Sequence, residues 1–212
     1  MSRTLKAAIV DYQLGNLFSV KHACDRTGMQ AQITADKDDI SAADLVILPG
    51  VGAFGDAMAT LNKLDLVSYL RDLALSGKPF LGICLGMQLL MSKSYEFAEH
   101  TGLGIMEGDV LPLNRATASK VPQVGWNKIH LTQAARQDGS FLNNLADGDY
   151  MYFVHSFYVK PNNPQVILSS TRYGDIEFCS SFRQGNVLGC QFHPERSGPQ
   201  GLRIYYNLSL SF

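Results

Sequence analysis

The sequence predicts an α/β protein built on a doubly wound mixed sheet, with helices on both faces and added antiparallel hairpins. In the first half, short apolar runs at 6–10, 45–48 and 79–83 alternate with stretches of helical periodicity. Continuous apolar runs of this length are typical of strands that a parallel sheet buries on both faces. In the second half, runs of residues that favour β-strands are separated by short turns that contain glycine, a pattern typical of hairpins.

The first half of the chain alternates between expected strands and helices. Lys6 to Val10 is the first expected strand, ending at an aspartate. A helix follows, from Asn16, which can cap its start, to Gly28, which can end it. A weaker strand closes at Thr34, and the run 45–48 is expected to be fully buried. This strand, helix, strand, strand order favours the doubly wound arrangement.

Two helical patterns, 56–61 and 66–75, precede a terminating Gly77 and the strand 79–83. Beyond Lys93 the predicted hairpin strands are 150–158, 166–172, 177–182 and 187–192. The turns expected within residues 103–192 are Asp138-Gly139, Asp147-Gly148, Tyr173-Gly174-Asp175 and Gln184-Gly185-Asn186. A closing helix is expected over 201–208.

Composition limits the possible functions. With 212 residues, 46% hydrophobic and 17% charged, the chain is expected to form a single domain, residues 1–212, around one core. A formal net charge of −1 gives no overall field to attract nucleic acid or an anionic membrane. No apolar stretch approaches the roughly 20 residues of a membrane span. A cytoplasmic protein is expected.

The four cysteines lie at irregular spacings, which form neither a metal-binding pair nor a disulfide framework. They fit a reducing compartment, and no metal or organic cofactor is expected.

Cys84 lies between two glycines, in the run Gly82-Ile83-Cys84-Leu85-Gly86. This pattern predicts a nucleophile elbow, in which a strand turns sharply into a helix and glycines remove collisions beside the nucleophile. The start of a helix also favours thiolate over thiol. The alternative is a structural cysteine buried beside packing glycines.

A cysteine nucleophile needs a base, and among five histidines only His193 has suitable neighbours, in His193-Pro194-Glu195. In an extended chain, residues i and i+2 point the same way, so Glu195 could orient the ring of His193 toward the thiol. The alternative is a turn carrying a surface carboxylate. The cysteine elbow favours the catalytic interpretation.

A glycine-rich turn, Pro49-Gly50-Val51-Gly52, follows the buried strand 45–48. Acyl transfer from an amide needs N–H donors for the developing oxyanion. Leu85 N–H is one expected donor, and the Gly50-Val51 peptide is the other. The alternatives are a tight turn or a phosphate-binding loop, although this turn lacks a P-loop lysine.

These motifs resemble those of class I, triad-type glutamine amidotransferases, and more closely the glutaminase subunits of imidazole glycerol phosphate synthase. The motifs G-x-C-x-G-x-Q at 82–88 and H-P-E at 193–195 mark the superfamily. The P-G-V-G turn at 49–52 and the V-G-W-N segment at 124–127 favour this member. Further matching segments are 11–17, 153–156 and 192–198. Arg196 departs from the pattern, since the family more often has lysine there, and the two cations differ in geometry.

The resemblance implies hydrolysis of L-glutamine through a thioester on Cys84, with His193 as the base. It also implies that ammonia passes to a (β/α)8-barrel cyclase, in a heterodimer that makes imidazole glycerol phosphate and AICAR in histidine biosynthesis. Three alternatives share parts of the pattern: a subunit of a different synthase, a stand-alone cysteine hydrolase, and a binding subunit without activity. The last would require a damaged triad or oxyanion turn, and neither is damaged in this sequence.

The resemblance also implies further site residues. Those expected to bind substrate are Gly52, Gln88, Glu96, His155, Ser156 and Phe157. Those expected at the partner interface are Trp126, Asn127, Tyr152 and Arg196. Each has an ordinary alternative: Gln88 as a polar residue on a helix face, Glu96 as a solvated loop carboxylate, and His155 as a satisfied sheet histidine. The two aromatic residues could be ordinary core or rim side chains.

Overall fold

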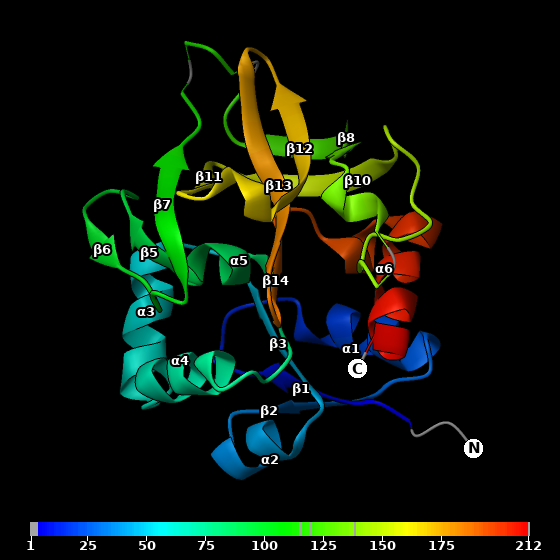
Figure 1. Cartoon of the computed structure of the whole chain (residues 1–212). Coiled ribbons are helices and arrows are strands. Elements are labelled where there is room, and N and C mark those ends of the chain that lie inside the picture. The colour runs from blue at the N-terminus through cyan, green and yellow to red at the C-terminus, as the bar shows by residue number, and fades with distance from the viewer. Residues whose placement is uncertain (1–3, 115, 119, 138, 212) are drawn as a thin grey trace.

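An eight-stranded mixed sheet runs through the computed structural model, which describes residues 4–114, 116–118, 120–137 and 139–211 (Figure 1). The strand order is β2-β1-β3-β4-β14-β13-β12-β9. The first five strands of this order are parallel, and the remaining pairs are antiparallel. Their bounds are β1 Lys6–Val10, β2 Gln30–Thr34, β3 Leu45–Gly50, β4 Phe80–Cys84, β9 His130–Leu131, β12 Ile167–Tyr173, β13 Ile176–Gln184 and β14 Val187–Cys190. The predicted doubly wound mixed sheet is confirmed.

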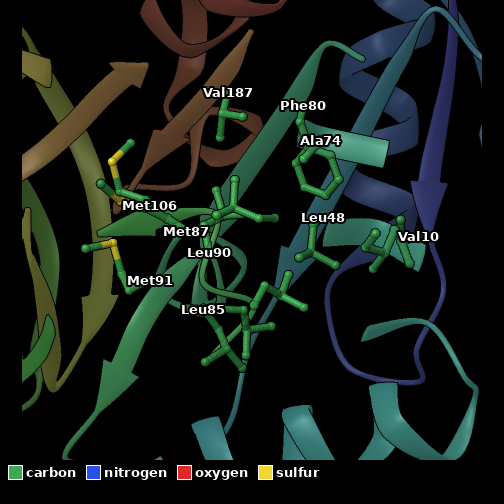
Figure 2. Close-up of a cluster of buried hydrophobic side chains, with 14 of the residues drawn as sticks. Val10, Leu48, Ala74, Phe80, Leu85, Met87, Leu90, Met91, Met106 and Val187 are labelled. Carbon is green, nitrogen blue, oxygen red and sulfur yellow. The ribbon is translucent and has the colours of Figure 1, made fainter. Parts of the chain in front are cut away.

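Helices cover both faces of the parallel part (Figure 1). On one face lie α1 (Leu17–Arg26) and α6 (Gly198–Ser211), and on the other lie α3 (Phe54–Lys63) and α4 (Val67–Leu75). Successive residues of a strand point to opposite faces of the sheet, so each strand contributes side chains to two separate cores. Ile47 packs with the α1 and α6 side, whereas Leu48 packs with α3 and α4 (Figure 2).

Two smaller sheets extend from the main one. The first pairs β8 (Gln123–Lys128) with β10 (Tyr150–His155), and the second has the order β11-β7-β5-β6. The strands of the second sheet are β5 Met91–Ser94, β6 His100–Thr101, β7 Met106–Pro112 and β11 Phe157–Pro161. Short 3-10 helices lie at Ala134–Arg136, Pro164–Val166 and Pro194–Arg196. Within the described ranges, no helix is long and apolar enough to cross a membrane.

Most strands of the main sheet fall where the sequence predicts them, but β9 was not predicted. Other differences lie outside this sheet. The run 150–158 is not one strand, because it divides at Ser156 between two different sheets. Asn16 precedes α1 but makes no side-chain capping bond. The helix α2 (Lys37–Ala42) was not predicted, although Asp36 caps it by accepting from two backbone N–H groups.

The turn pairs also differ in outcome. Gly174-Asp175 and Gly185-Asn186 join β12 to β13 and β13 to β14, as predicted. Asp147-Gly148 lies between β9 and β10, which do not pair with each other, so that hairpin prediction is wrong. Asp138 lies outside the described residues. The strand predicted over 187–192 ends at Cys190.

Candidate active site

Cys84 occupies a strained backbone position where β4 turns into α5 (Leu85–Leu89). Its φ of 54° and ψ of −111° lie outside the conformations that ordinary residues adopt readily. Such strain is typical of nucleophile elbows, where the turn projects the reactive side chain clear of both elements. The predicted strand-to-helix elbow at Cys84 is therefore present.

A side chain at either flanking glycine would collide with a different neighbouring group. A Cβ at Gly82 would lie 2.8 Å from the carbonyl group of Gly86, which is the predicted collision across the elbow. A Cβ at Gly86 would lie only 1.7 Å from the carbonyl oxygen of Leu48 in β3. Glycine at 86 therefore lets α5 approach the neighbouring strand, which brings the elbow against the Pro49-Gly50 turn.

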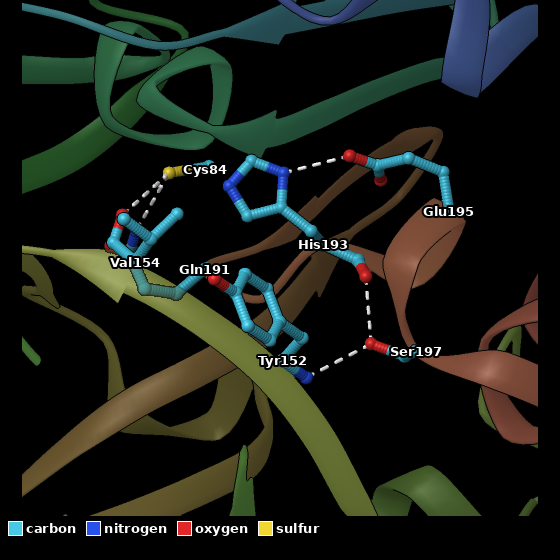
Figure 3. Close-up of polar contacts among 7 residues, drawn as sticks. All are labelled: Cys84, Tyr152, Val154, Gln191, His193, Glu195 and Ser197. Atoms are coloured by element: carbon cyan, nitrogen blue, oxygen red, sulfur yellow. Dashed lines mark hydrogen bonds and ion pairs between the residues drawn. The ribbon is translucent and has the colours of Figure 1, made fainter. Parts of the chain in front are cut away.

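The ring of His193 lies between Cys84 and Glu195 (Figure 3). Its Nδ1 is 2.8 Å from Glu195 Oε1, and the Glu195 side chain is almost completely buried. Its Nε2 faces the Cys84 sulfur and has no other hydrogen-bond partner among the described residues. The expected pairing is present, but Glu195 reaches the ring from a 3-10 turn, Pro194–Arg196, rather than from extended chain.

Hydrogen bonds to the backbone of His193 also hold this residue in place. Ser197 Oγ donates to the carbonyl oxygen of His193 over 2.7 Å, and Tyr152 N–H donates to that hydroxyl over 3.0 Å (Figure 3). The backbone N–H of His193 donates to the Tyr152 carbonyl over 2.9 Å. These bonds tie the histidine to β10, so the ring has little freedom to move away from the thiol.

The electrostatics favour a charged histidine. Burial alone would lower the pKa of His193, but the negative charge of an ionised Cys84, the hydrogen bond to that sulfur and the interaction with Glu195 raise the pKa to about 10. A proton taken from Cys84 can therefore be held on the ring. This is the arrangement that a thiolate–imidazolium pair requires.

A cavity of about 230 Å³ opens beside the Cys84 sulfur. It is lined by most of the residues that the sequence analysis assigned to the oxyanion and substrate sites: Val51, Gly52, Leu85, Gln88, Glu96, His155, Ser156 and Phe157. Gly50 is buried, is not among the lining residues, and lies opposite Cys84 in the β3–β4 register. Pro122 and Val154 also line the cavity and were not predicted.

Comparison with known proteins agrees with this geometry. The family model described as glutamine amidotransferase class-I matches residues 8–211. A protein named imidazole glycerol phosphate synthase subunit HisH from Rhodopirellula baltica is 46% identical and aligns over 92% of this chain and 93% of its own. A protein of the same name from Lactiplantibacillus plantarum is 47% identical, over 92% and 91%. The chain belongs to the HisH family of class I glutamine amidotransferases.

Solved structures agree with the amidotransferase fold. The structure of PurLQS from Thermotoga maritima has a TM-score of 0.73 at 21% identity, covering 97% of this chain and 98% of that one. A crystal structure described as a glutamine amidotransferase has a TM-score of 0.73 at 20% identity, covering 97% and 99%. At these identities the likeness shows the fold alone.

Two residues assigned to substrate binding in this amidotransferase are buried and held in place. Gln88 Nε2 donates to the Phe157 carbonyl over 2.9 Å. Glu96 Oε2 accepts from Phe54 N–H, the first residue of α3, over 2.5 Å. Burial raises the pKa of Glu96, opposed by that hydrogen bond. The alternatives of a polar helix face for Gln88 and a solvated carboxylate for Glu96 are therefore wrong.

His155 is a buried, neutral histidine at the cavity. Burial lowers its pKa to about 4, despite its hydrogen bond to the Phe157 carbonyl. That carbonyl lies 2.8 Å from Nδ1 and can only accept, so Nδ1 carries the proton. Nε2 is then an acceptor, and it has no partner among the described residues. The alternative of a fully satisfied sheet histidine is therefore not met.

The residues assigned to the partner interface do not all lie together. Trp126 is 56% exposed and contacts the ring of Tyr152 edge-on, with centroids 6.1 Å apart. The Arg196 guanidinium lies over the same ring at 4.5 Å. Asn127 follows Trp126 in β8 and so points to the other side of the strand, where its amide donates to Arg172 O.

Two residues near the nucleophile were not predicted. Gln191 is fully buried, and its Nε2 lies 3.5 Å from the Cys84 sulfur. Tyr12 is also fully buried and donates to the Pro49 carbonyl. The signal available for Gln191 was its position two residues before His193, directly after the end of β14. In the part of the chain that the structure describes, no group of His, Cys, Asp or Glu is arranged to hold a metal.

Proposed function

We propose that this amidotransferase chain is the glutaminase subunit of an imidazole glycerol phosphate synthase. It would hydrolyse L-glutamine to glutamate and ammonia, and pass the ammonia to a cyclase subunit of the (β/α)8-barrel type in the cytoplasm. That partner would make imidazole glycerol phosphate and AICAR in histidine biosynthesis. The observation that carries the proposal is the His193 ring, held by Glu195 and facing the Cys84 sulfur at a cavity.

In the first half of the reaction, the Cys84 sulfur attacks the carboxamide carbon while its proton moves to Nε2 of His193. The carbonyl oxygen becomes an oxyanion that accepts from the N–H groups of Leu85 and Val51. The C–N bond then breaks, and the His193 proton leaves on ammonia. The product is a γ-glutamyl thioester on Cys84.

In the second half, a water molecule attacks the thioester carbon and gives a proton to His193. The carbon–sulfur bond breaks, glutamate is released, and the Cys84 thiolate is restored beside a protonated His193. Because Glu195 accepts from Nδ1, it keeps Nε2 directed at the sulfur in both halves and stabilises the charged ring.

The lining of the cavity supports glutamine as the substrate. Glu96 contributes a carboxylate to the lining, which suits the α-ammonium group, and Gln88 also lines the cavity. The backbone of the 156–157 segment, which Gln88 contacts at the Phe157 carbonyl, also lines the cavity and suits the α-carboxylate. A volume of about 230 Å³ is close to the size of one small amino acid rather than a peptide.

The exposed Trp126, packed against the half-buried Tyr152 with Arg196 over the same ring, supports association with a partner on this side of the molecule. Two alternatives remain within the same chemistry. A subunit of a different synthase would respond to a different partner, and a stand-alone hydrolase would respond to none.

The test is steady-state glutaminase kinetics for the chain alone, with a barrel-type cyclase, and with the cyclase plus its nucleotide-like substrate. We expect little turnover alone and a rise in kcat, rather than a fall in KM, on adding partner and ligand. Cys84→Ala should abolish ammonia release from glutamine but leave synthesis from ammonium salts in the complex. Full turnover by the chain alone would contradict the partner-dependent interpretation.

A further inference from the structure

A chain of buried hydrogen bonds leads from the cavity wall to the nucleophile. Gln88 Nε2 donates to the Phe157 carbonyl over 2.9 Å and to Gln191 Oε1 over 3.0 Å. Gln191 Nε2 in turn lies 3.5 Å from the Cys84 sulfur (Figure 3). Both glutamine side chains are buried, Gln191 completely.

The direction of this chain is determined by its first member. A backbone carbonyl can only accept, so Phe157 requires the NH₂ group of Gln88 to face it. The second proton of that NH₂ group points to Gln191, which must therefore present its oxygen. Nε2 of Gln191 is left facing Cys84. The amide is thus oriented by its neighbours to offer an N–H to the sulfur, and not a carbonyl.

The surroundings of the sulfur make this donor important. On another side lies the Val154 carbonyl oxygen at 3.7 Å, which can accept from a neutral S–H but repels a thiolate. Once His193 has taken the proton, its Nε2–H and the Gln191 amide can both donate to the sulfur, and only the Gln191 donor carries no catalytic proton. Hydrogen bonds to charged groups are stronger than those to neutral ones, so this bond favours the ionised nucleophile.

We propose that Gln191 is a further catalytic residue, whose amide N–H holds the Cys84 thiolate in place and stabilises it, with Gln88 fixing the orientation of that amide. The inference rests on the proposed function. Because Gln88 and Phe157 also line the cavity, glutamine bound there contacts the groups that aim the donor at the sulfur. Substrate binding and nucleophile orientation are coupled through these two amides.

The test is the pH dependence of Cys84 alkylation by iodoacetamide in the full chain, with peptide mass mapping to isolate this thiol from the other buried cysteines. Gln191→Met keeps the length of the side chain but removes the donor. We expect alkylation about tenfold slower at pH 7, with the rate profile displaced to higher pH. In the complex with the cyclase, kcat should fall about tenfold with KM nearly unchanged.

Two further variants separate this role from packing. Gln191→Glu retains an acceptor for Gln88 but places an oxygen against the sulfur, so alkylation should be slower still. Gln123→Met makes the same change at another buried glutamine that does not contact Cys84, and should leave the alkylation profile at its wild-type position. If Gln191→Met does not fold, Gln191→Asn, which withdraws the amide by one methylene, should give the same displacement.

An unshifted alkylation profile in the folded Gln191 variant would overturn the inference. This outcome is distinct from failure of the proposed function. If the Cys84→Ala variant hydrolyses glutamine as fast as the wild-type protein, the proposed function fails. If that activity depends on Cys84 and the Gln191 profile is unchanged, only the role of Gln191 is lost.

Discussion

The Tyr12 hydroxyl donates a buried hydrogen bond of 2.7 Å to the carbonyl of Pro49, thirty-seven residues further along the chain. This bond joins the loop after β1 to the turn that carries the proposed oxyanion donor. The fit is close, because a Cβ at Gly50 would lie 2.1 Å from the same hydroxyl. Tyr12 therefore holds the Pro49-Gly50 segment in place through this hydrogen bond and through close packing against Gly50.

Replacing Tyr12 with Phe should loosen this turn. The Pro49 carbonyl would lose a buried partner, and we expect a loss of about 1–3 kcal/mol in the free energy of unfolding. We also expect kcat for glutamine hydrolysis in the complex to fall more than KM changes, since an oxyanion donor acts in the transition state. Urea denaturation and steady-state kinetics measure the two effects.

Tyr69→Phe is the matched control for this prediction. The Tyr69 hydroxyl donates to a backbone carbonyl, that of Lys37, and neither residue lines the cavity. The control should lose stability without a selective effect on kcat. Equal kinetic effects in the two variants would show that Tyr12 has no special connection to the oxyanion turn.

His193 and Glu195 should behave as one unit. Because Glu195 acts only through the ring it orients, the double variant His193→Ala/Glu195→Ala should lose little more activity than His193→Ala alone. Glu195→Gln, which can still contact the ring, should be the mildest of the three. Glutaminase rates in the complex provide the measurement. Losses that multiply in the double variant would mean that the two residues act independently.

His155 should make the protein sensitive to acid. Its pKa is lowered to about 4 by burial, whereas in the unfolded chain it is near 6.5. The unfolded state therefore binds the proton first, and stability is lost as pH falls from about 6.5 toward 4, by at most about 1.4 kcal/mol per pH unit. His155→Gln should reduce this dependence.

Urea denaturation at several values between pH 4.5 and pH 7 measures the effect of His155→Gln. His22→Gln provides a matched control, because it makes the same change at a histidine that is exposed on α1. We expect His22→Gln to keep the wild-type slope of stability against pH. The same slope in His155→Gln would show that another group is responsible for the acid sensitivity.

Trp126 should contribute to binding of the cyclase. Exposed aromatic side chains that an interface buries often dominate its affinity, so Trp126→Ala should weaken association by about tenfold or more. The stability of the isolated chain should hardly change, because the indole is more than half exposed. Phe18→Ala, on the far more exposed ring of α1, is the control and should leave the affinity unchanged. Titration calorimetry would measure both, and equal affinities for the two variants would exclude Trp126 from the interface.

Much of the fold and site follows from local patterns in the sequence. The runs 45–48 and 79–83 are short and apolar at consecutive positions, as is typical of a strand covered on both faces, and both lie in buried strands of the structure. The elbow at Cys84 and the pairing of His193 with Glu195 also depend on residues a few positions apart. Short-range geometry determines such features, so spacing alone could predict them.

Other features were decided only by tertiary structure. Helix α2 is short and has a single fully buried residue, Ile40, so its apolar periodicity gave no signal. The division of the run 150–158 at Ser156 depends on two different partners, β8 and β7, which lie elsewhere in the chain. A run of extended residues carries no information about which sheet each half will join.

The same limit applies to the site. The sequence by itself determined that a thiol, a base and an orienting carboxylate were available, because each lies in a motif with its own local geometry. It did not determine that Gln191 faces Cys84 or that Tyr12 supports Pro49. Those contacts exist because β14 and β4 lie side by side in the sheet, and because the loop after β1 crosses the end of β3. The order of strands in the sheet brings these residues together, and that order depends on how the whole chain packs.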